Sequence, residues 1–202
     1  RKASEAYNLK IDPQAEVWLF IDSHRDAHVS KPGEQTSAPP IDDLLLLRRH
    51  KMKLSPSTLE YSVSIAASLA HYFLEQRRSV GLVTSSEREY TVIPAERSER
   101  QEAKILEALA FLQAESTFTL PSLVTAQIGQ LPQGSSAIMI TPMIWPELLL
   151  AVDSLQRRNL RPVVVLLMSQ SFGHRTGNED LAATLESRKV PVCRVYCDAD
   201  LA

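Results

Sequence analysis

The stretch from residue 16 to residue 22 is Glu-Val-Trp-Leu-Phe-Ile-Asp, an almost continuous apolar run that ends in an acid. Runs of this kind form strands that are buried on both faces, as in parallel sheets covered by helices. The segments 79–84, 136–141 and 162–168 have the same character. We therefore predict a parallel sheet at the centre of the fold, with an acid at the carboxyl end of its first strand.

Helical segments alternate with these strands. Two of them are predicted to begin at capping boxes, in which a serine and a residue three positions later satisfy each other's backbone N–H groups. These boxes are Ser57-Thr58-Leu59-Glu60 and Ser98-Glu99-Arg100-Gln101. Further helices are predicted to begin at Pro121, Pro146 and Asn178.

Two weaker strands complete the pattern, an edge strand over 89–93 that Pro94 ends and a closing strand over 190–196. The alternation predicts an α/β fold: a doubly wound, mainly parallel, Rossmann-like sheet with helices on both faces. We expect one domain over residues 1–202, with a long insertion loop at about 23–56. Since the chain begins with an arginine rather than a methionine, we expect it to be a fragment of a longer protein.

Composition limits the classes of function. Lysine plus arginine is 22 and aspartate plus glutamate is 24, a formal net charge of −2, which favours neither nucleic acid nor an anionic membrane as partner. No apolar run reaches the roughly 18 residues that span a membrane. The only cysteines, Cys193 and Cys197, show no disulfide framework, which suits the cytoplasm. The six glycines form no phosphate-binding motif.

Candidate functional residues gather where the strands end, because ligands of open parallel sheets bind beyond the carboxyl ends of the strands. Asp22, His24 and Asp26 follow the first strand, Thr141 ends the 136–141 strand, and Thr117 lies in the loop before Pro121. Carboxylate and hydroxyl oxygens are the ligands that Mg²⁺ and Mn²⁺ prefer.

This set resembles the metal-ion-dependent adhesion site of von Willebrand factor A domains, which combines Asp-x-Ser-x-Ser after the first strand with a threonine and a later aspartate. Asp22 corresponds to the leading acid, and Thr117 corresponds to the threonine. His24 and Asp26 stand where the two serines would be, and Pro142 stands at the later aspartate.

More narrowly, the chain resembles the bacterial family fifty-eight of the domains of unknown function, which are membrane-anchored proteins with a cytoplasmic von Willebrand A-like module. The resemblance lies in residues 16–22, 57–82, 98–101 with the helix that follows, and 161–163. It implies a cytoplasmic domain of a membrane-anchored protein and, as partner, an ATPase of the MoxR-type AAA class.

Because three of the five site positions differ from the family's pattern, we expect a degenerate adhesion site. Asp22, Asp26 and Thr117 are its remaining candidate ligands for Mg²⁺ or Mn²⁺, and we expect His24 and Thr141 to contact a partner. The predicted function is therefore a non-enzymatic protein-interaction module that has no cofactor.

Other hypotheses stay open at this level. One is a metal-dependent hydrolase that uses Asp22, His24 and Asp26 to activate water. A second is a transition-metal site that adds His28 to His24 and Asp26, and a third is a small-molecule sensor in the same crevice. The basic stretch 48–53, beside the leucines of 44–47, is either a solvated face or a docking element for an acidic partner.

Overall fold

A computed structural model describes residues 15–31 and 54–198. Six strands form one sheet, and their bounds are β1 Val17–Ile21, β2 Val80–Ser85, β3 Tyr90–Glu96, β4 Ser136–Thr141, β5 Arg161–Leu167 and β6 Val192–Val195. The strand order is β3-β2-β1-β4-β5-β6, in which only β3 is antiparallel to its neighbour. The order reverses direction at β1, so the switch point of the sheet lies between β1 and β4, which is where open α/β sheets bind their ligands.

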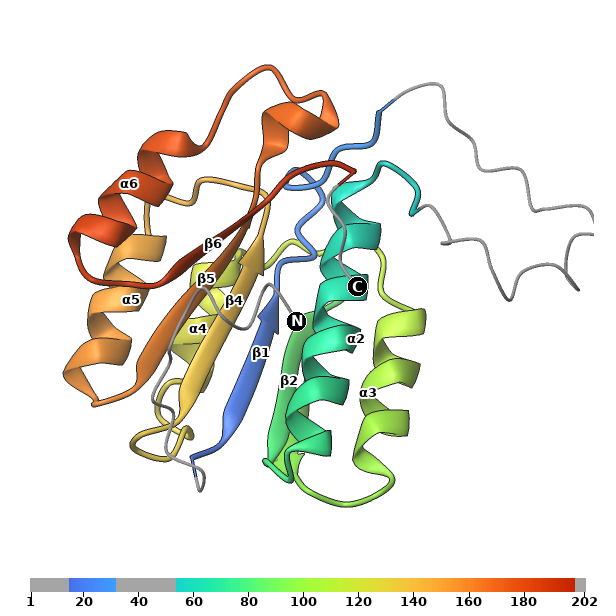
Figure 1. The fold of residues 1–202 in the computed structure, drawn as a ribbon, viewed down its shortest axis with the longest axis vertical. Coiled ribbons are helices and arrows are strands. Elements are labelled where there is room, and N and C mark those ends of the chain that lie inside the picture. Colours follow the sequence, from blue (N-terminus) through green and yellow to red (C-terminus); the bar gives the residue numbers. More distant parts are fainter. Residues whose placement is uncertain (1–14, 32–53, 199–202) are drawn as a thin grey trace, which may run out of the picture.

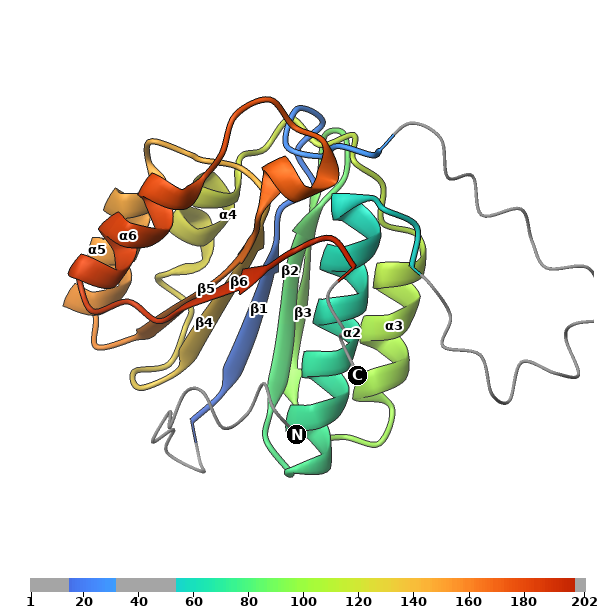
Figure 2. The same ribbon diagram turned by 45° about the horizontal axis from the view of Figure 1, so that its top comes forward.

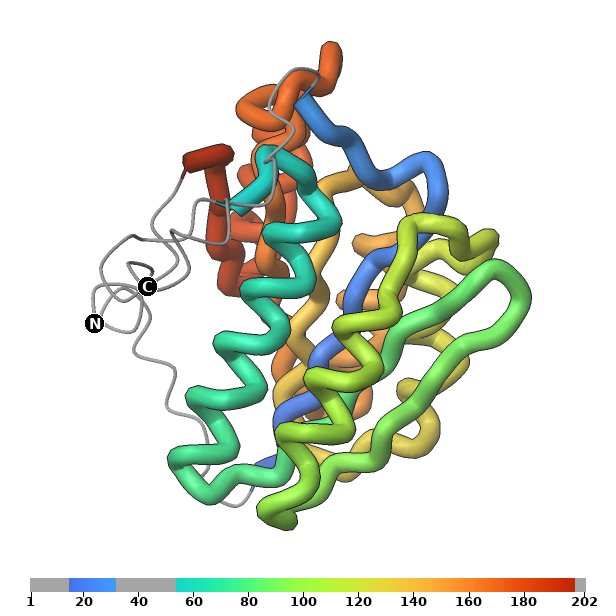
Figure 3. Tube along the Cα trace, turned by 90° about the vertical axis from the view of Figure 1, so that its right-hand side faces the viewer, coloured from blue at the N-terminus to red at the C-terminus, as the bar shows by residue number. Residues whose placement is uncertain are grey.

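The helices connect the strands and cover both faces of the sheet. Their bounds are α2 Thr58–Glu75, α3 Gln101–Ala110, α4 Leu120–Gln127, α5 Leu148–Arg157 and α6 Glu179–Ser187, with a short 3₁₀ turn η2 at Ser169–Phe172. Figure 1 shows the helices on either side of the sheet, and Figure 3 shows α2 and α3 side by side on one of its faces. The predicted doubly wound α/β fold is confirmed.

The alternation of side chains along β1 creates two separate cores. Val17, Leu19 and Ile21 pack with α2 and α3, whereas Trp18 and Phe20 face α4, α5 and α6 on the opposite side. All five residues of β1 are buried. This double burial is the physical reason why the strand is a continuous apolar run rather than an alternating one.

The helix starts lie near the predicted positions, but neither capping box forms. Ser57 is the residue before α2, yet its side chain makes no capping hydrogen bond. The second helix starts at Gln101, the last residue of its box, and the Gln101 side-chain amide donates to the carbonyl oxygens of Val80 and Pro94. At the second helix, contacts to the sheet therefore replace the local cap that the sequence suggested.

The predicted end of the edge strand at Pro94 is wrong, because β3 continues to Glu96. Pro94 lies at a shift in register between β2 and β3, where Val80 pairs with Glu96 and Leu82 pairs with Ile93. Proline has no N–H to donate, so an irregularity on an edge strand tolerates it.

The described ends of the insertion meet at the start of α2. Ser30 forms an antiparallel bridge with Ser57, and the Lys31 N–H donates to the Pro56 carbonyl at 3.0 Å. The leucines of 44–47 and the basic stretch 48–53 lie outside the described residues. Within 15–31 and 54–198, no helix has the length and apolar character needed to cross a membrane.

Gly81 gives a test of the packing on β1. A Cβ at Gly81 would lie 2.7 Å from Trp18 Cε3 and 3.0 Å from the Ile93 carbonyl oxygen, so Gly81→Ala must displace a buried ring. We expect it to lower the free energy of unfolding by about 1–3 kcal/mol, the usual cost of overpacking. Gly129→Ala is the control, because nothing lies within 4 Å of its added Cβ. Urea unfolding of both variants checks this, and equal stability would contradict the packing.

Candidate functional site

The site is organised around the carboxylate of Asp22, which is fully buried at the end of β1. Three hydrogen bonds reach it. The Trp145 indole Nε1–H donates to Oδ2 at 2.6 Å, the Thr141 hydroxyl donates to Oδ2 at 2.7 Å, and the His24 backbone N–H donates to Oδ1 at 3.1 Å. Burying a carboxylate without such donors would be strongly unfavourable, so the chain itself supplies the polar surroundings of this acid.

The sheet and the loop before α5 bring these donors together. The Asp22 N–H donates to the Ile140 carbonyl at 3.0 Å, which extends the β1–β4 pairing to the edge and sets Thr141 beside Asp22. The Thr141 hydroxyl also accepts the Met143 N–H at 3.1 Å, and this bond turns the chain toward Trp145. Trp145 is only 8% exposed, so water scarcely reaches its bond to Asp22.

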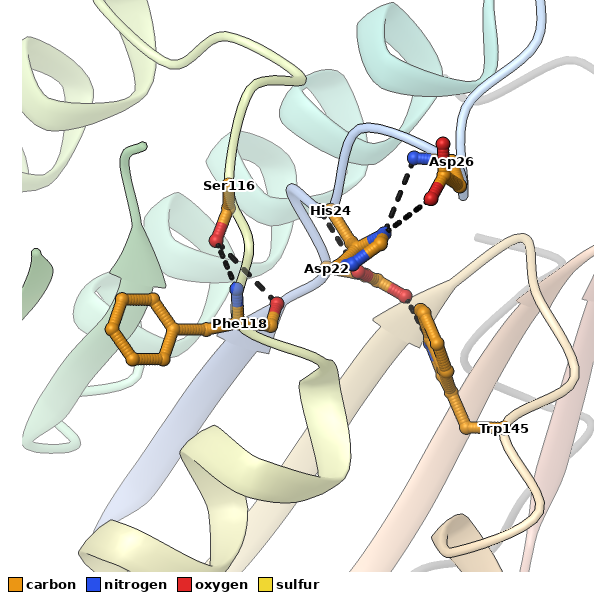
Figure 4. A network of polar contacts seen from close by, with 6 residues as sticks. All are labelled: Asp22, His24, Asp26, Ser116, Phe118 and Trp145. Atoms are coloured by element: carbon orange, nitrogen blue, oxygen red, sulfur yellow. Dashed lines mark hydrogen bonds and ion pairs between the residues drawn. The ribbon is translucent and has the colours of Figure 1, made fainter. Parts of the chain in front are cut away.

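His24 lies next to the hydrogen bond between Trp145 and Asp22, and its side chain is mostly buried. Its ring meets the Trp145 ring edge to face, with centroids 4.9 Å apart. His24 Nδ1 accepts the backbone N–H of Asp26 at 3.2 Å, while the Asp26 carboxylate is exposed and lies 3.9 Å from the same nitrogen. Figure 4 shows Asp22 directed at Trp145, and Asp26 on the opposite side of His24.

His28 joins this loop to the start of α2. Its Nε2 lies 2.7 Å from the Asp22 carbonyl oxygen, so Nε2 carries the proton and Nδ1 faces the Thr58 hydroxyl at 3.1 Å. The Thr58 hydroxyl also accepts the Val29 N–H at 3.0 Å. Burial lowers the pKa of His28, and its hydrogen bond to the Asp22 backbone opposes this effect in part.

A buried chain of serine hydroxyls closes the other side of the site. The Ser85 hydroxyl donates to Ser116 Oγ at 2.7 Å, and the Ser23 hydroxyl donates to the Ser85 carbonyl oxygen at 2.7 Å. Ser116 Oγ in turn accepts the Phe118 N–H at 2.9 Å, as Figure 4 shows. These bonds fix the loop before α4 against the ends of β1 and β2.

Thr117, one of the predicted ligands, is exposed and does not face Asp22. Its hydroxyl donates to the Glu87 carbonyl at 3.0 Å, on the turn between β2 and β3, and the buried neighbour Ser116 takes the inward position. Thr141, predicted to contact a partner, is fully buried, and its hydroxyl donates to the Asp22 carboxylate instead. Sequence position alone does not settle which of two adjacent hydroxyls in a loop faces inward.

The predicted ligands therefore do not fit a divalent cation in this arrangement. Asp22 already accepts bonds from the indole and hydroxyl, the Asp26 carboxylate points to solvent, and Thr117 is directed at a backbone carbonyl. Among the described residues, no cluster of three or more histidine, cysteine, aspartate or glutamate side chains is placed to hold a metal ion. The set Asp22, His24 and Asp26 does not converge on one point where a water molecule would be activated.

Trp145 is a residue of this site that the sequence analysis did not predict. Its sequence position predicted packing at the rim, beside the helix that Pro146 opens, and gave no reason to expect a bond to an acid 123 residues away. The available signal was indirect: an acid buried at the end of a strand requires hydrogen-bond donors, and the chain must supply them. The chain matches no protein-family model and no curated protein.

Trp145→Phe tests the bond to Asp22, because it keeps an aromatic ring and removes the indole donor. We expect it to lower the free energy of unfolding by about 1.5–3 kcal/mol, as for a lost hydrogen bond to a charged group. Trp18→Phe is the matched control: the Trp18 indole donates to the half-exposed Glu16 carboxylate, where water substitutes for the lost donor. In an Asp22→Asn background the Trp145→Phe cost should shrink. An unchanged cost would show that the bond contributes nothing.

The lowered pKa of His28 predicts that the stability of the fold depends on pH. Its pKa is lowered in the fold from 6.5, so below about pH 6.5 the unfolded chain binds a proton that the folded chain does not. The contribution to stability is complete above that pH and is lost as the pH falls toward the lowered value. Urea unfolding at pH 7.5 and 5.5 should show a larger loss for the wild type than for His28→Gln. Equal losses would contradict the assignment.

Proposed function

We propose that this chain is a non-enzymatic protein-interaction module of the von Willebrand A-like kind, whose metal position has been taken over by donors from the chain. One observation carries the proposal: the Asp22 carboxylate is fully buried and accepts bonds from Trp145 and Thr141. A working adhesion site needs this acid open to a cation. Because the carboxylate accepts three hydrogen bonds from the chain, it holds the strand ends in position instead.

The docking surface of the module is the loop that surrounds Asp22, rather than Asp22 itself. Arg25 and Asp26 are exposed and His24 is half-buried, all on a segment that several bonds hold rigid. The Arg25 N–H donates to the Ser116 carbonyl at 3.1 Å, and the Ala27 N–H donates to the His24 carbonyl at 3.0 Å. A surface fixed before binding loses little conformational entropy when a partner docks.

The partner that fits the proposal is an ATPase of the MoxR-type AAA class, and the setting is the cytoplasmic side of a membrane-anchored parent protein. The resemblance to family fifty-eight supports both. An α/β fold with a mainly parallel sheet is the fold that the resemblance implies. Arg25 and Asp26 present opposite charges side by side, which favours recognition by polar complementarity rather than by apolar burial.

Binding to a MoxR-type ATPase encoded in the same genome tests the proposal. Calorimetric titration should give the same dissociation constant in EDTA and in Mg²⁺, when nucleotide is absent. Arg25→Glu should weaken binding at least about tenfold, by analogy with a lost charged contact at an interface. Arg157→Glu is the control, since Arg157 is exposed at the far end of α5. Binding that requires Mg²⁺ and is lost in Asp22→Asn would overturn the proposal, and so would absence of binding.

A further inference from the structure

A groove of about 840 Å³ lies between α4 and α5, on the face of the sheet opposite α2 and α3. Both helices begin at the carboxyl edge of the sheet, so one end of the groove lies beside the site around Asp22. Figure 2 shows α4 and α5 on the same side of the sheet. Trp145 and Pro146 line this end of the groove, and Ala126 and Ser154 lie further along the helices.

The groove is apolar in effect, although several hydroxyl groups line it. The Ser122 hydroxyl donates to the Thr119 carbonyl at 2.7 Å, and the Thr125 hydroxyl donates to the Pro121 carbonyl at 2.8 Å. The Ser154 hydroxyl likewise donates to the carbonyl oxygen one turn before it. Because these hydroxyl groups already donate to backbone carbonyls, an apolar ligand that covers them leaves none of these donors without an acceptor.

Two side chains of the groove stand out: Leu150, which is apolar and strongly exposed, and Glu147, which is charged. Leu150 projects from α5 with 67% of its surface accessible, the second largest exposure among the large apolar residues described. Glu147, immediately before α5, is the only ionisable residue that lines the groove among the residues that the structure describes. The groove therefore presents an apolar channel with a single negative charge at the end nearest the carboxyl edge.

The length of the groove suits a helix. The eight residues of α4 rise about 12 Å, which is roughly two turns of a third helix laid alongside. Small side chains such as Ala126 and Ala151 line the channel and allow close approach. A helix bound in this way presents apolar residues at positions i, i+3 or i+4, and i+7.

We propose that the groove binds an amphipathic helix of a partner protein, with an apolar stripe packed on Leu150 and a lysine or arginine paired with Glu147. The charge of Glu147 selects a basic residue at one end of that stripe. This inference rests on the proposed function only in taking a protein as the ligand. It adds a second contact surface, distinct from the loop that carries Arg25.

Trp145 connects the two surfaces. Its ring lines the groove while its indole N–H donates to Asp22, so a helix in the groove changes the surroundings of a residue that belongs to the site. The chain has one other tryptophan, Trp18, in the core. In a Trp18→Phe background, the fluorescence of Trp145 alone reports occupation of the groove.

A phage-displayed library of helical peptides, selected on the purified full chain, provides the test. We expect enriched peptides to share the apolar spacing and a basic residue at one end, and to shift Trp145 fluorescence. Leu150→Glu should weaken their binding at least tenfold. Glu147→Lys should weaken it as well, and exchange of the peptide's basic residue for glutamate should restore it. Phe111→Glu removes an apolar side chain that is 79% exposed and lies outside the groove, and should change nothing.

Enriched peptides that bind Leu150→Glu and the wild type equally would overturn this inference, as would failure to enrich any peptide. A dimer in sedimentation that Leu150→Glu converts to a monomer would identify the occupant as a second copy of the chain, which also contradicts a separate partner. Failure to enrich any peptide, together with ATPase binding that Arg25→Glu abolishes, would refute the groove alone. The proposed function would then stand.

Discussion

A carboxylate that is buried away from water needs hydrogen-bond donors. In this protein the ends of the strands and the loops that follow them supply those donors to Asp22. Asp22 is fully buried, and no ion pair reaches it within the described residues. An indole, a hydroxyl and a backbone N–H provide the donors instead. Neutral donors that are fixed in place stabilise a buried charge without a counter-ion, provided the surrounding structure holds them there.

The rest of the carboxyl edge provides that support. Pairing of β1 with β4 sets Thr141 in position, and the turn at Met143 brings in Trp145. On the other side, His28 and the serine chain through Ser85 join the Asp22 loop to α2 and to the loop before α4. Segments far apart in the sequence thus meet at one acid. A surface built on such a frame suits recognition that does not depend on a cation, and the α4–α5 groove adjoins it through Trp145.

The sequence predicted the layers of this fold because burial on both faces leaves a clear signal, the continuous apolar strand, and that signal needs no knowledge of partners. It predicted Asp22 at the carboxyl edge for the same reason. The second capping box does not form, and the Gln101 side chain instead finds acceptors in the sheet, at Val80 and Pro94. The sequence did not show that Ser116 rather than Thr117 faces inward, or that Trp145 donates to Asp22, since both depend on which way a loop turns in three dimensions. Local sequence does not encode that direction.

The central claim is that the Trp145 indole N–H, rather than a metal ion, binds the Asp22 carboxylate. Paramagnetic Mn²⁺ tests it directly, since it broadens the NMR signals of protons close to where it binds. In ¹⁵N-labelled protein titrated with Mn²⁺ at pH 7.5, the indole N–H signal of Trp145 should keep its intensity as well as that of Trp18. Selective loss of the Trp145 signal at stoichiometric Mn²⁺, abolished by Asp22→Asn, would show that a cation reaches the carboxylate, and would contradict the account.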